Sequence, residues 1–237
     1  MAPARGASRA RLRRTGHACL AIISVVGAML SRYDGRTPAL WAGHAMGINA
    51  GMMKATNVPM PQLAIKLAAL RARMATHPMR SAMRLGLCVG AVSFLICMLM
   101  LLVAEALFSP QQLGDSASES LKGASTATVF WMAVVWAPLF ETLIGQWLPL
   151  EVLRRYRVRA GFGLLVSAAL FSLLHIMGGS GIVHACMTFI GGGILSASYL
   201  TARSMGLAPA YVAAATAHAC VNGLILCGSL LFPDLLG

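Results

Sequence analysis

Residues 137–146 read Ala-Pro-Leu-Phe-Glu-Thr-Leu-Ile-Gly-Gln, which sets a carboxylate and a carboxamide within an otherwise apolar segment. A charged side chain at mid-depth in a bilayer costs roughly 2.5–3.5 kcal/mol on insertion scales. Glu141 is therefore a candidate functional residue, and its partners should be polar residues on other apolar segments. Two later stretches supply them, Phe-Ser-Leu-Leu-His at 171–175 and His-Ala-Cys-Val-Asn at 218–222.

The composition of the 237-residue chain is that of an integral membrane protein. Hydrophobic residues make up 58% and charged residues 11%, whereas a soluble domain of this length needs more charge to cover its surface. Runs rich in Gly and Ala favour closely packed helices over a barrel, whose strands would alternate polar and apolar residues. We predict an all-α, polytopic transmembrane helical bundle of about five spans with a basic N-terminal segment.

The net charge of +12 is concentrated near the N-terminus, since thirteen of the nineteen Lys and Arg precede residue 85. A basic segment beside apolar spans is suited to anionic lipid headgroups. Membrane lipid is therefore an expected partner, and no motif indicates nucleic acid. The six Cys form no C-x-x-C pair, so we predict neither a disulfide framework nor a zinc knuckle.

Residues 1–84 form the basic N-terminal region. Arg-rich residues 1–16 precede the apolar run 18–30, which resembles a signal peptide but has only 13 residues, short of the roughly 20 that span a bilayer. A start-site artefact, an interfacial anchor and an uncleaved signal-like segment are the three interpretations. Residues 61–84 read as a basic, Ala-rich helix on the membrane surface.

Residues 85–237 form the multi-span membrane domain. A polar loop at 109–126 separates the first two of the five predicted spans, which are 85–108, 128–150, 161–177, 182–200 and 207–231. The positive-inside rule puts the N-terminal region, the arginines at 154–159 and Arg203 on the cytoplasmic side of a cytoplasmic (inner) membrane. Glu141 then lies nearer the arginines than His175 does, so a helix must tilt or kink for them to meet. Pro138, Pro149 and the glycines at 178–181 are the expected places.

The polar residues of the three stretches suffice for hydrolysis by water. His175 lies four residues after Phe171, and Asn222 four after His218, so each pair shares a helix face. Glu141 or His175 would deprotonate water, while His218 and Asn222 would hydrogen-bond the developing oxyanion.

The order Glu-x-x-x-x-Gln, Phe-x-x-x-His and His-x-x-x-Asn on successive apolar segments resembles the intramembrane proteases of the CPBP family. That family includes the type II CAAX prenyl endopeptidases and the bacteriocin-processing or immunity Abi proteins. The resemblance covers residues 128–231. It implies an intramembrane endopeptidase with Glu141, His175, His218 and Asn222 as catalytic residues. Its substrate would be a membrane-associated peptide or protein, prenylated or not.

The first motif departs from the family's common Glu-Glu-x-x-x-Arg. Thr142 stands where the second Glu is expected and Gln146 where the Arg is expected. Removing both members of a charge pair together is less damaging than removing one. We therefore interpret Thr142 and Gln146 as a coordinated variant of the supporting shell, to which Phe171 also belongs.

The sequence does not decide whether a metal ion takes part in the reaction. Glu141, His175 and His218 are the residues that would hold a divalent ion such as zinc, but the close spacing of H-E-x-x-H is absent. Family members are thought to work without a metal, and the metal-free mechanism is our expectation.

Two other functions fit the same residues. The altered first motif suits a catalytically silent scaffold or bacteriocin immunity factor, although such a protein would not need all four catalytic residues. A small transporter or proton relay also places Glu and His in mid-membrane, but no internal repeat supports it.

Overall fold

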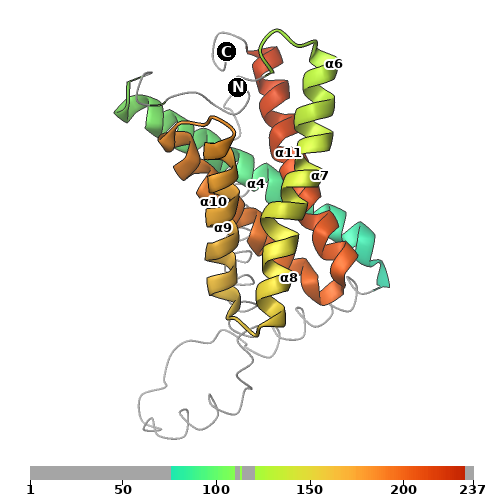
Figure 1. Ribbon diagram of the computed structural model, residues 1–237. Helices are drawn as coiled ribbons and strands as arrows, with labels where there is room; N and C mark the ends of the chain where they lie inside the picture. Colours follow the sequence, from blue (N-terminus) through green and yellow to red (C-terminus); the bar gives the residue numbers. More distant parts are fainter. Residues whose placement is uncertain (1–75, 110–112, 114–120, 233–237) are drawn as a thin grey trace, which may run out of the picture. The chain divides into compact units, whose positions relative to one another are not determined.

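The computed structural model describes residues 76–109, 113 and 121–232, all of which belong to one compact unit. The predictions for residues 1–75, including the signal-like run and most of the surface helix, lie outside the described residues. In the described part every element is a helix, and five helices are long and apolar enough to cross a membrane (Figure 1). The predicted all-α, multi-span fold is confirmed.

The first span is longer at its N-terminal end than predicted. Helix α4 is Pro78–Leu107, so it begins seven residues before Leu85. Pro78 suits a first turn, where a backbone N–H has no intrahelical acceptor to lose. Arg80 and Arg84 are exposed on this early part of the helix, where their flexible stems let the charged heads reach water.

The second span consists of five consecutive segments that follow one another along one column in Figure 1. They are α6 (Thr126–Val129), η2 (Phe130–Trp136), α7 (Ala137–Thr142), η3 (Leu143–Trp147) and α8 (Leu148–Arg155). Ser125 caps the start, because its hydroxyl accepts the Thr128 N–H at 3.2 Å. The segments η2 and η3 are π-helical, and each ends two residues before a proline, Pro138 or Pro149.

The last three spans agree with the prediction to within two residues. They are α9 (Ala160–Met177), α10 (Ile182–Ala202, continued by the 3₁₀ turn η4, Arg203–Met205) and α11 (Leu207–Leu231). Glycines with positive φ make the two connections, since Gly179 follows α9 with φ +97° and Gly206 precedes α11 with φ +126°. Such backbone is readily adopted only without a Cβ.

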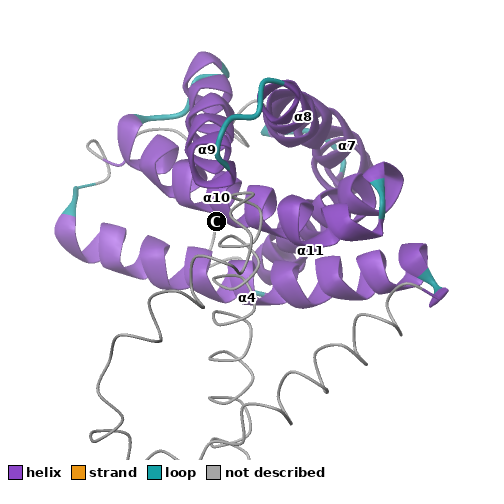
Figure 2. Cartoon of the chain, turned by 90° about the horizontal axis from the view of Figure 1, so that it is seen from below, coloured by secondary structure: helices purple, strands orange, loops and turns teal. Residues whose placement is uncertain are grey.

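Helix α11 packs along α4, and α10 contacts α9, α11 and α4; Figure 2 shows α4 and α11 side by side. Small residues make the α4–α11 approach close. A Cβ added to Gly86 would lie 2.5 Å from the carbonyl oxygen of Ala213, and one added to Gly90 would lie 2.6 Å from Cβ of Cys220. Glycines four residues apart are typical of membrane helices in backbone contact.

Large apolar side chains point away from the bundle, as lipid requires. Three leucines on α4 are 62–66% exposed, namely Leu95, Leu99 and Leu102. The interior instead holds small residues, including four alanines of α11 that are fully buried: Ala210, Ala213, Ala214 and Ala217. Packing of small side chains, rather than exclusion of water, therefore holds the helices together.

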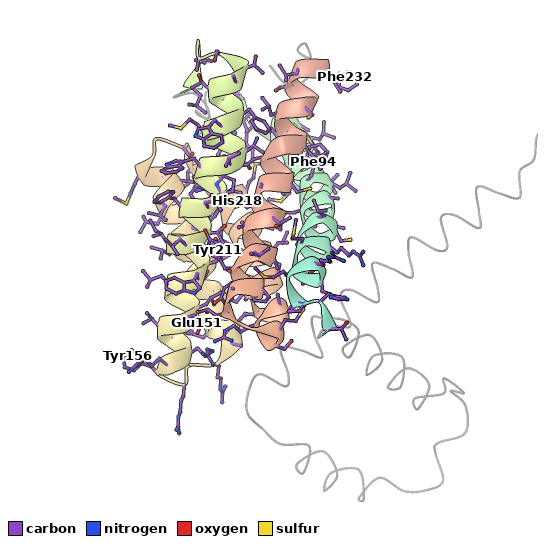
Figure 3. The ribbon with its side chains drawn as sticks, turned by 90° about the vertical axis from the view of Figure 1, so that its right-hand side faces the viewer. Phe94, Glu151, Tyr156, Tyr211, His218 and Phe232 are labelled. Carbon is purple, nitrogen blue, oxygen red and sulfur yellow. The ribbon has the colours of Figure 1, made fainter. Side chains whose placement is uncertain are left out.

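One end of the bundle is fixed by a carboxylate that the sequence analysis overlooked. Glu151 on α8 accepts hydrogen bonds from Arg154 and Arg203, at 2.8 and 2.6 Å, and from the hydroxyl of Tyr199 at 3.0 Å. Since Arg154 and Arg203 share this partner, the ends of the second and fourth spans lie together, as predicted. Glu151 and Tyr156 mark this end in Figure 3, and Phe232 marks the opposite one.

Candidate active site

Glu141 lies in the short α-helical segment between two π-helical ones. The six residues of α7, Ala137–Thr142, separate η2 from η3. A π-helical turn widens the helix and changes which side chains share a face, and such turns occur frequently at functional sites. The irregular backbone thus sets the direction of Glu141 relative to the rest of the second span.

Side chains from other spans donate hydrogen bonds to backbone carbonyls of this irregular region. The amide of Asn222 donates to the Ala133 carbonyl at 2.8 Å, and the hydroxyl of Tyr211 donates to that of Leu139 at 2.7 Å. The hydroxyl of Ser167 donates to the carbonyl of Gly145 and also contacts Ser196 at 2.7 Å. Such bonds let a membrane helix keep a broken backbone ladder.

The carboxylate of Glu141 faces two imidazole rings. Its Oε2 lies 3.6 Å from Nε2 of His218 and 3.9 Å from Nε2 of His175. Glu141 and His175 lie at nearly the same depth when counted from the end of the bundle at which the second span ends and α9 begins. Glu141 precedes Arg155, the last residue of α8, by fourteen residues, and His175 follows Ala160, the first residue of α9, by fifteen. The difference of one residue corresponds to about 1.5 Å of helix rise. The offset expected from the sequence is therefore too small to keep the two apart.

A backbone contact fixes the orientation of His175. Its Nδ1 lies 2.9 Å from the carbonyl oxygen of Phe171, one turn earlier on α9. Because a carbonyl can only accept, Nδ1 carries the hydrogen. In the neutral ring Nε2 is then an acceptor, and this nitrogen is the one that faces Glu141.

Phe171 packs against both imidazoles. Its ring centroid lies 4.6 Å from that of His175 and 5.5 Å from that of His218. Glycines of the second and fourth spans make room for it, because a Cβ on either Gly145 or Gly192 would lie 2.9 Å from Phe171 atoms. Phe171 thus lies against both histidines, and its supporting role stays a prediction.

The exposure of the three ionisable side chains falls toward the interior. The side chain of Glu141 is 34% exposed, that of His175 16% and that of His218 7%. His218 lies near the middle of α11, between the two ends that Glu151 and Phe232 mark in Figure 3. A reacting group would therefore approach from the Glu141 side and meet His218 last.

Asn222 is oriented by the second span. Its side chain is one turn from His218 on α11, and one N–H of its amide is occupied by the Ala133 carbonyl. A carboxamide has two N–H groups and one acceptor oxygen, so a second N–H remains for another acceptor. The structure thus brings Glu141, His175, His218 and Phe171 into one cluster and ties Asn222, one turn further along α11, to the backbone of the second span.

Thr142 and Gln146 are both fully buried. Within the described residues, the hydroxyl of Thr142, both polar atoms of the Gln146 amide and Nδ1 of His218 are buried with no hydrogen-bond partner. An Arg side chain at position 146 would need a carboxylate partner one turn earlier, and the residue at that position is the uncharged Thr142. The neutral pair suits this interior better than one charged residue would.

Glu141, His175 and His218 are the residues considered for a metal. In the part of the chain that the structure describes, no group of three or more His, Cys, Asp or Glu side chains is found that could hold an ion. We derive no chemical step through a metal.

A groove opens in the half of α11 that leads to Phe232. Its volume is about 540 Å³. It runs between the start of the second span and the second half of α11, and its walls are almost entirely apolar. Cys220 and Gly223 of α11 line it, together with Phe130 and Trp131 from η2, whereas none of the four candidate catalytic residues does.

Comparison with known protein families gives one match. Residues 123–224 match the family described as type II CAAX prenyl endopeptidase Rce1-like, a family of membrane proteases. The matched region contains Glu141, His175, His218 and Asn222, and it confirms the resemblance seen in the motifs. Comparison with curated proteins and with solved structures gave no match. With five helices able to cross a membrane, the chain is a multi-pass integral membrane protein.

Proposed function

We propose that this chain, whose residues 123–224 match the Rce1-like family of type II CAAX prenyl endopeptidases, hydrolyses a peptide bond of a membrane-associated protein. The observation that carries the proposal is the position of the Glu141 carboxylate, 3.6 and 3.9 Å from two imidazole nitrogens within spans that otherwise present apolar surface. A carboxylate facing two histidines at mid-span is costly in lipid and calls for a function.

In this mechanism Glu141 is the general base. It takes a proton from a water molecule, whose oxygen attacks the carbonyl carbon of the scissile bond. The proton then goes to the leaving nitrogen as the C–N bond breaks. Nε2 of His175 faces the carboxylate as an acceptor, because Nδ1 is held on the Phe171 carbonyl. His175 therefore shares the proton transfer with Glu141.

His218 and Asn222 supply the hydrogen bonds to the tetrahedral oxyanion. His218 would donate through Nε2, the nitrogen that faces Glu141, and Asn222 through the N–H that is not bonded to Ala133. Donors held in place before the reaction, and shielded from water, lower the barrier more than mobile ones.

The apolar groove between the start of the second span and α11 supports a substrate with an apolar anchor. Its walls come from α6, η2 and α11, and the lining residues Cys220 and Gly223 are close in sequence to Asn222. A prenylated CAAX-type C-terminus combines a lipid chain with a peptide bond close to it, and an apolar groove between membrane spans suits such a lipid chain. We assign the chain to the cytoplasmic (inner) membrane, with the arginine-rich end at the cytoplasm.

The test compares the peptide termini in membranes of cells that express the wild type or Glu141→Gln. The amide keeps the shape of Glu141 and removes the base. Glu105→Gln is the matched control, because Glu105 is an exposed carboxylate on α4. We expect a set of termini that vanishes in Glu141→Gln and persists in Glu105→Gln at equal expression.

The alternative function is a catalytically silent scaffold or immunity factor. The observation that favours it is the Thr142–Gln146 pair, which lacks the charges of the family motif and has no hydrogen-bond partner among the described residues. The same experiment separates the two, since a scaffold leaves identical termini in all three samples.

A further inference from the structure

The hydrogen bond from Asn222 to the second span depends on a backbone carbonyl that no backbone N–H occupies. In an α-helix the N–H of residue 137 would reach the carbonyl of Ala133. Here the N–H of Ala137 reaches Met132 instead, in the π register. The next donor in that register is residue 138, which is a proline and has no N–H. The carbonyl of Ala133 is therefore left for Asn222, which donates to it at 2.8 Å.

The other proline of the second span, Pro149, also follows a π-helical segment but leaves a different carbonyl. The N–H of Leu148 reaches Leu143 in the π register, so the carbonyl that Pro149 leaves in that register is Ile144, and the one it leaves in the α register is Gly145. An α-helical bond from residue 149 would reach the carbonyl of Gly145, but Pro149 has no N–H. The hydroxyl of Ser167 on α9 donates to the Gly145 carbonyl instead. Both prolines thus follow a π-helical segment, and a side chain of another span donates to a carbonyl that a proline cannot reach, in the π register at Pro138 and in the α register at Pro149.

The Ala133 carbonyl fixes the orientation of the Asn222 amide. Only the nitrogen of a carboxamide can face a carbonyl oxygen, so the bond determines which way the amide points. One N–H is then directed at Ala133, and the plane of the group sets the direction of the other. His218 lies one turn away on the same helix, so the direction of this second N–H decides whether it can act with His218.

We propose that Pro138 is a positioning residue, which keeps the Ala133 carbonyl available so that it orients the Asn222 amide beside His218. The catalytic part of this inference rests on the proposed function, whereas the hydrogen-bonding part does not. Pro138 touches no reacting atom and acts through the backbone of residue 133.

The first test is a double-mutant cycle on thermal unfolding of the full-length protein in detergent. Asn222→Ala leaves the Ala133 carbonyl without a donor and should lower the unfolding midpoint by roughly 3–6 °C. In the Pro138→Ala background residue 138 regains an N–H that can reach Ala133. Adding Asn222→Ala to Pro138→Ala should then lower the midpoint by less than half as much.

Pro149→Ala is the matched control, because it restores an N–H near Gly145 and not near Ala133. Its effect on the unfolding midpoint should add to that of Asn222→Ala without coupling. The proposal is overturned if Pro138→Ala and Asn222→Ala also add, or if Pro149→Ala couples to Asn222→Ala as strongly as Pro138→Ala does.

The second test measures kcat and KM on a peptide whose cleavage depends on Glu141. Pro138→Ala should lower kcat about tenfold with little change in KM, and it should cause no further loss of kcat once Asn222 is alanine. Equal losses of kcat with Asn or Ala at position 222 would overturn the positioning role. If no cleavage depends on Glu141, the proposed function fails, and the unfolding cycle alone decides the hydrogen-bonding claim.

Discussion

At the scale of single residues, the Thr142–Gln146 pair shows how a family motif can change without leaving a buried charge. The two residues lie one turn apart on the interior side of the second span, and both are fully buried. A lone charge in that position would be uncompensated, which costs about 3–5 kcal/mol in typical proteins. The neutral pair avoids this cost, so it is consistent with a coordinated change at both positions.

Gln146→Arg alone should therefore lower the free energy of unfolding by about 3–5 kcal/mol. Adding Thr142→Glu should recover at least half of the loss, because the carboxylate would pair with the guanidinium one turn away. Gln146→Met is the control of similar volume, and it should leave stability unchanged or raised, since it removes an unpartnered amide. Unfolding by heat or denaturant in detergent measures all four proteins. Equal stability of Gln146→Arg and the wild type would show that a lone charge at position 146 carries no cost.

At the scale of helices, α4 and α11 pack closely because glycines of α4 have no side chain at the contact between them. The carbonyl of Ala213 and Cβ of Cys220 occupy the space that side chains at positions 86 and 90 would need. Contacts of this kind gain their energy from many weak dispersion interactions between closely spaced atoms. A single methyl group at either glycine must push the helices apart.

Gly86→Ala and Gly90→Ala should each lower the free energy of unfolding by about 1–3 kcal/mol, as overpacking does. Gly191→Ala on α10 is the matched control, because a Cβ there meets nothing within 4 Å. It should stabilise the helix by about 0.4–1 kcal/mol. The three variants can be compared by thermal unfolding, and a loss at Gly191 equal to that at Gly86 would argue against close packing as the cause.

Sequence patterns predicted the helices better than their internal register. Hydropathy located the last three spans to within two residues, because an apolar run long enough to cross lipid leaves little choice of structure. Prolines at 138 and 149 indicated a break, but not that it takes the form of two π-helical segments. That form depends on donors from other spans, Asn222 and Ser167, whose positions are set by tertiary packing.

At the scale of the molecule, the sequence also predicted the cluster of Glu141, His175 and His218, because each is a costly polar residue in an apolar run. Glu151 was missed for the opposite reason. It stands at the end of a span beside arginines, where a carboxylate is unremarkable from sequence. Only the fold shows that Arg203, fifty-two residues later, shares it.

The shared position of Arg154 and Arg203 fixes which span ends lie together and leads to a prediction about orientation. In a variant without its native cysteines, Tyr156→Cys should react with a membrane-impermeant thiol reagent only from the cytoplasmic side. Phe232→Cys, at the other end in Figure 3, should react only from outside. The reason is the excess of arginine at the Tyr156 end. The reverse pattern in intact cells and inverted vesicles would refute the orientation.

If the Glu141 carboxylate activates water, the cleavage rate should fall in steps when this carboxylate is first withdrawn and then removed. The measurement is the cleavage rate of a Glu141-dependent peptide by purified protein in lipid vesicles. Glu141→Asp keeps the carboxylate but withdraws it, and the rate should fall roughly 100-fold. Glu141→Gln removes the base, so the rate should fall further, within the 10²–10⁴-fold range typical of general bases. A Gln variant that cleaves at the wild-type rate would show that the Glu141 carboxylate is not the base that activates water.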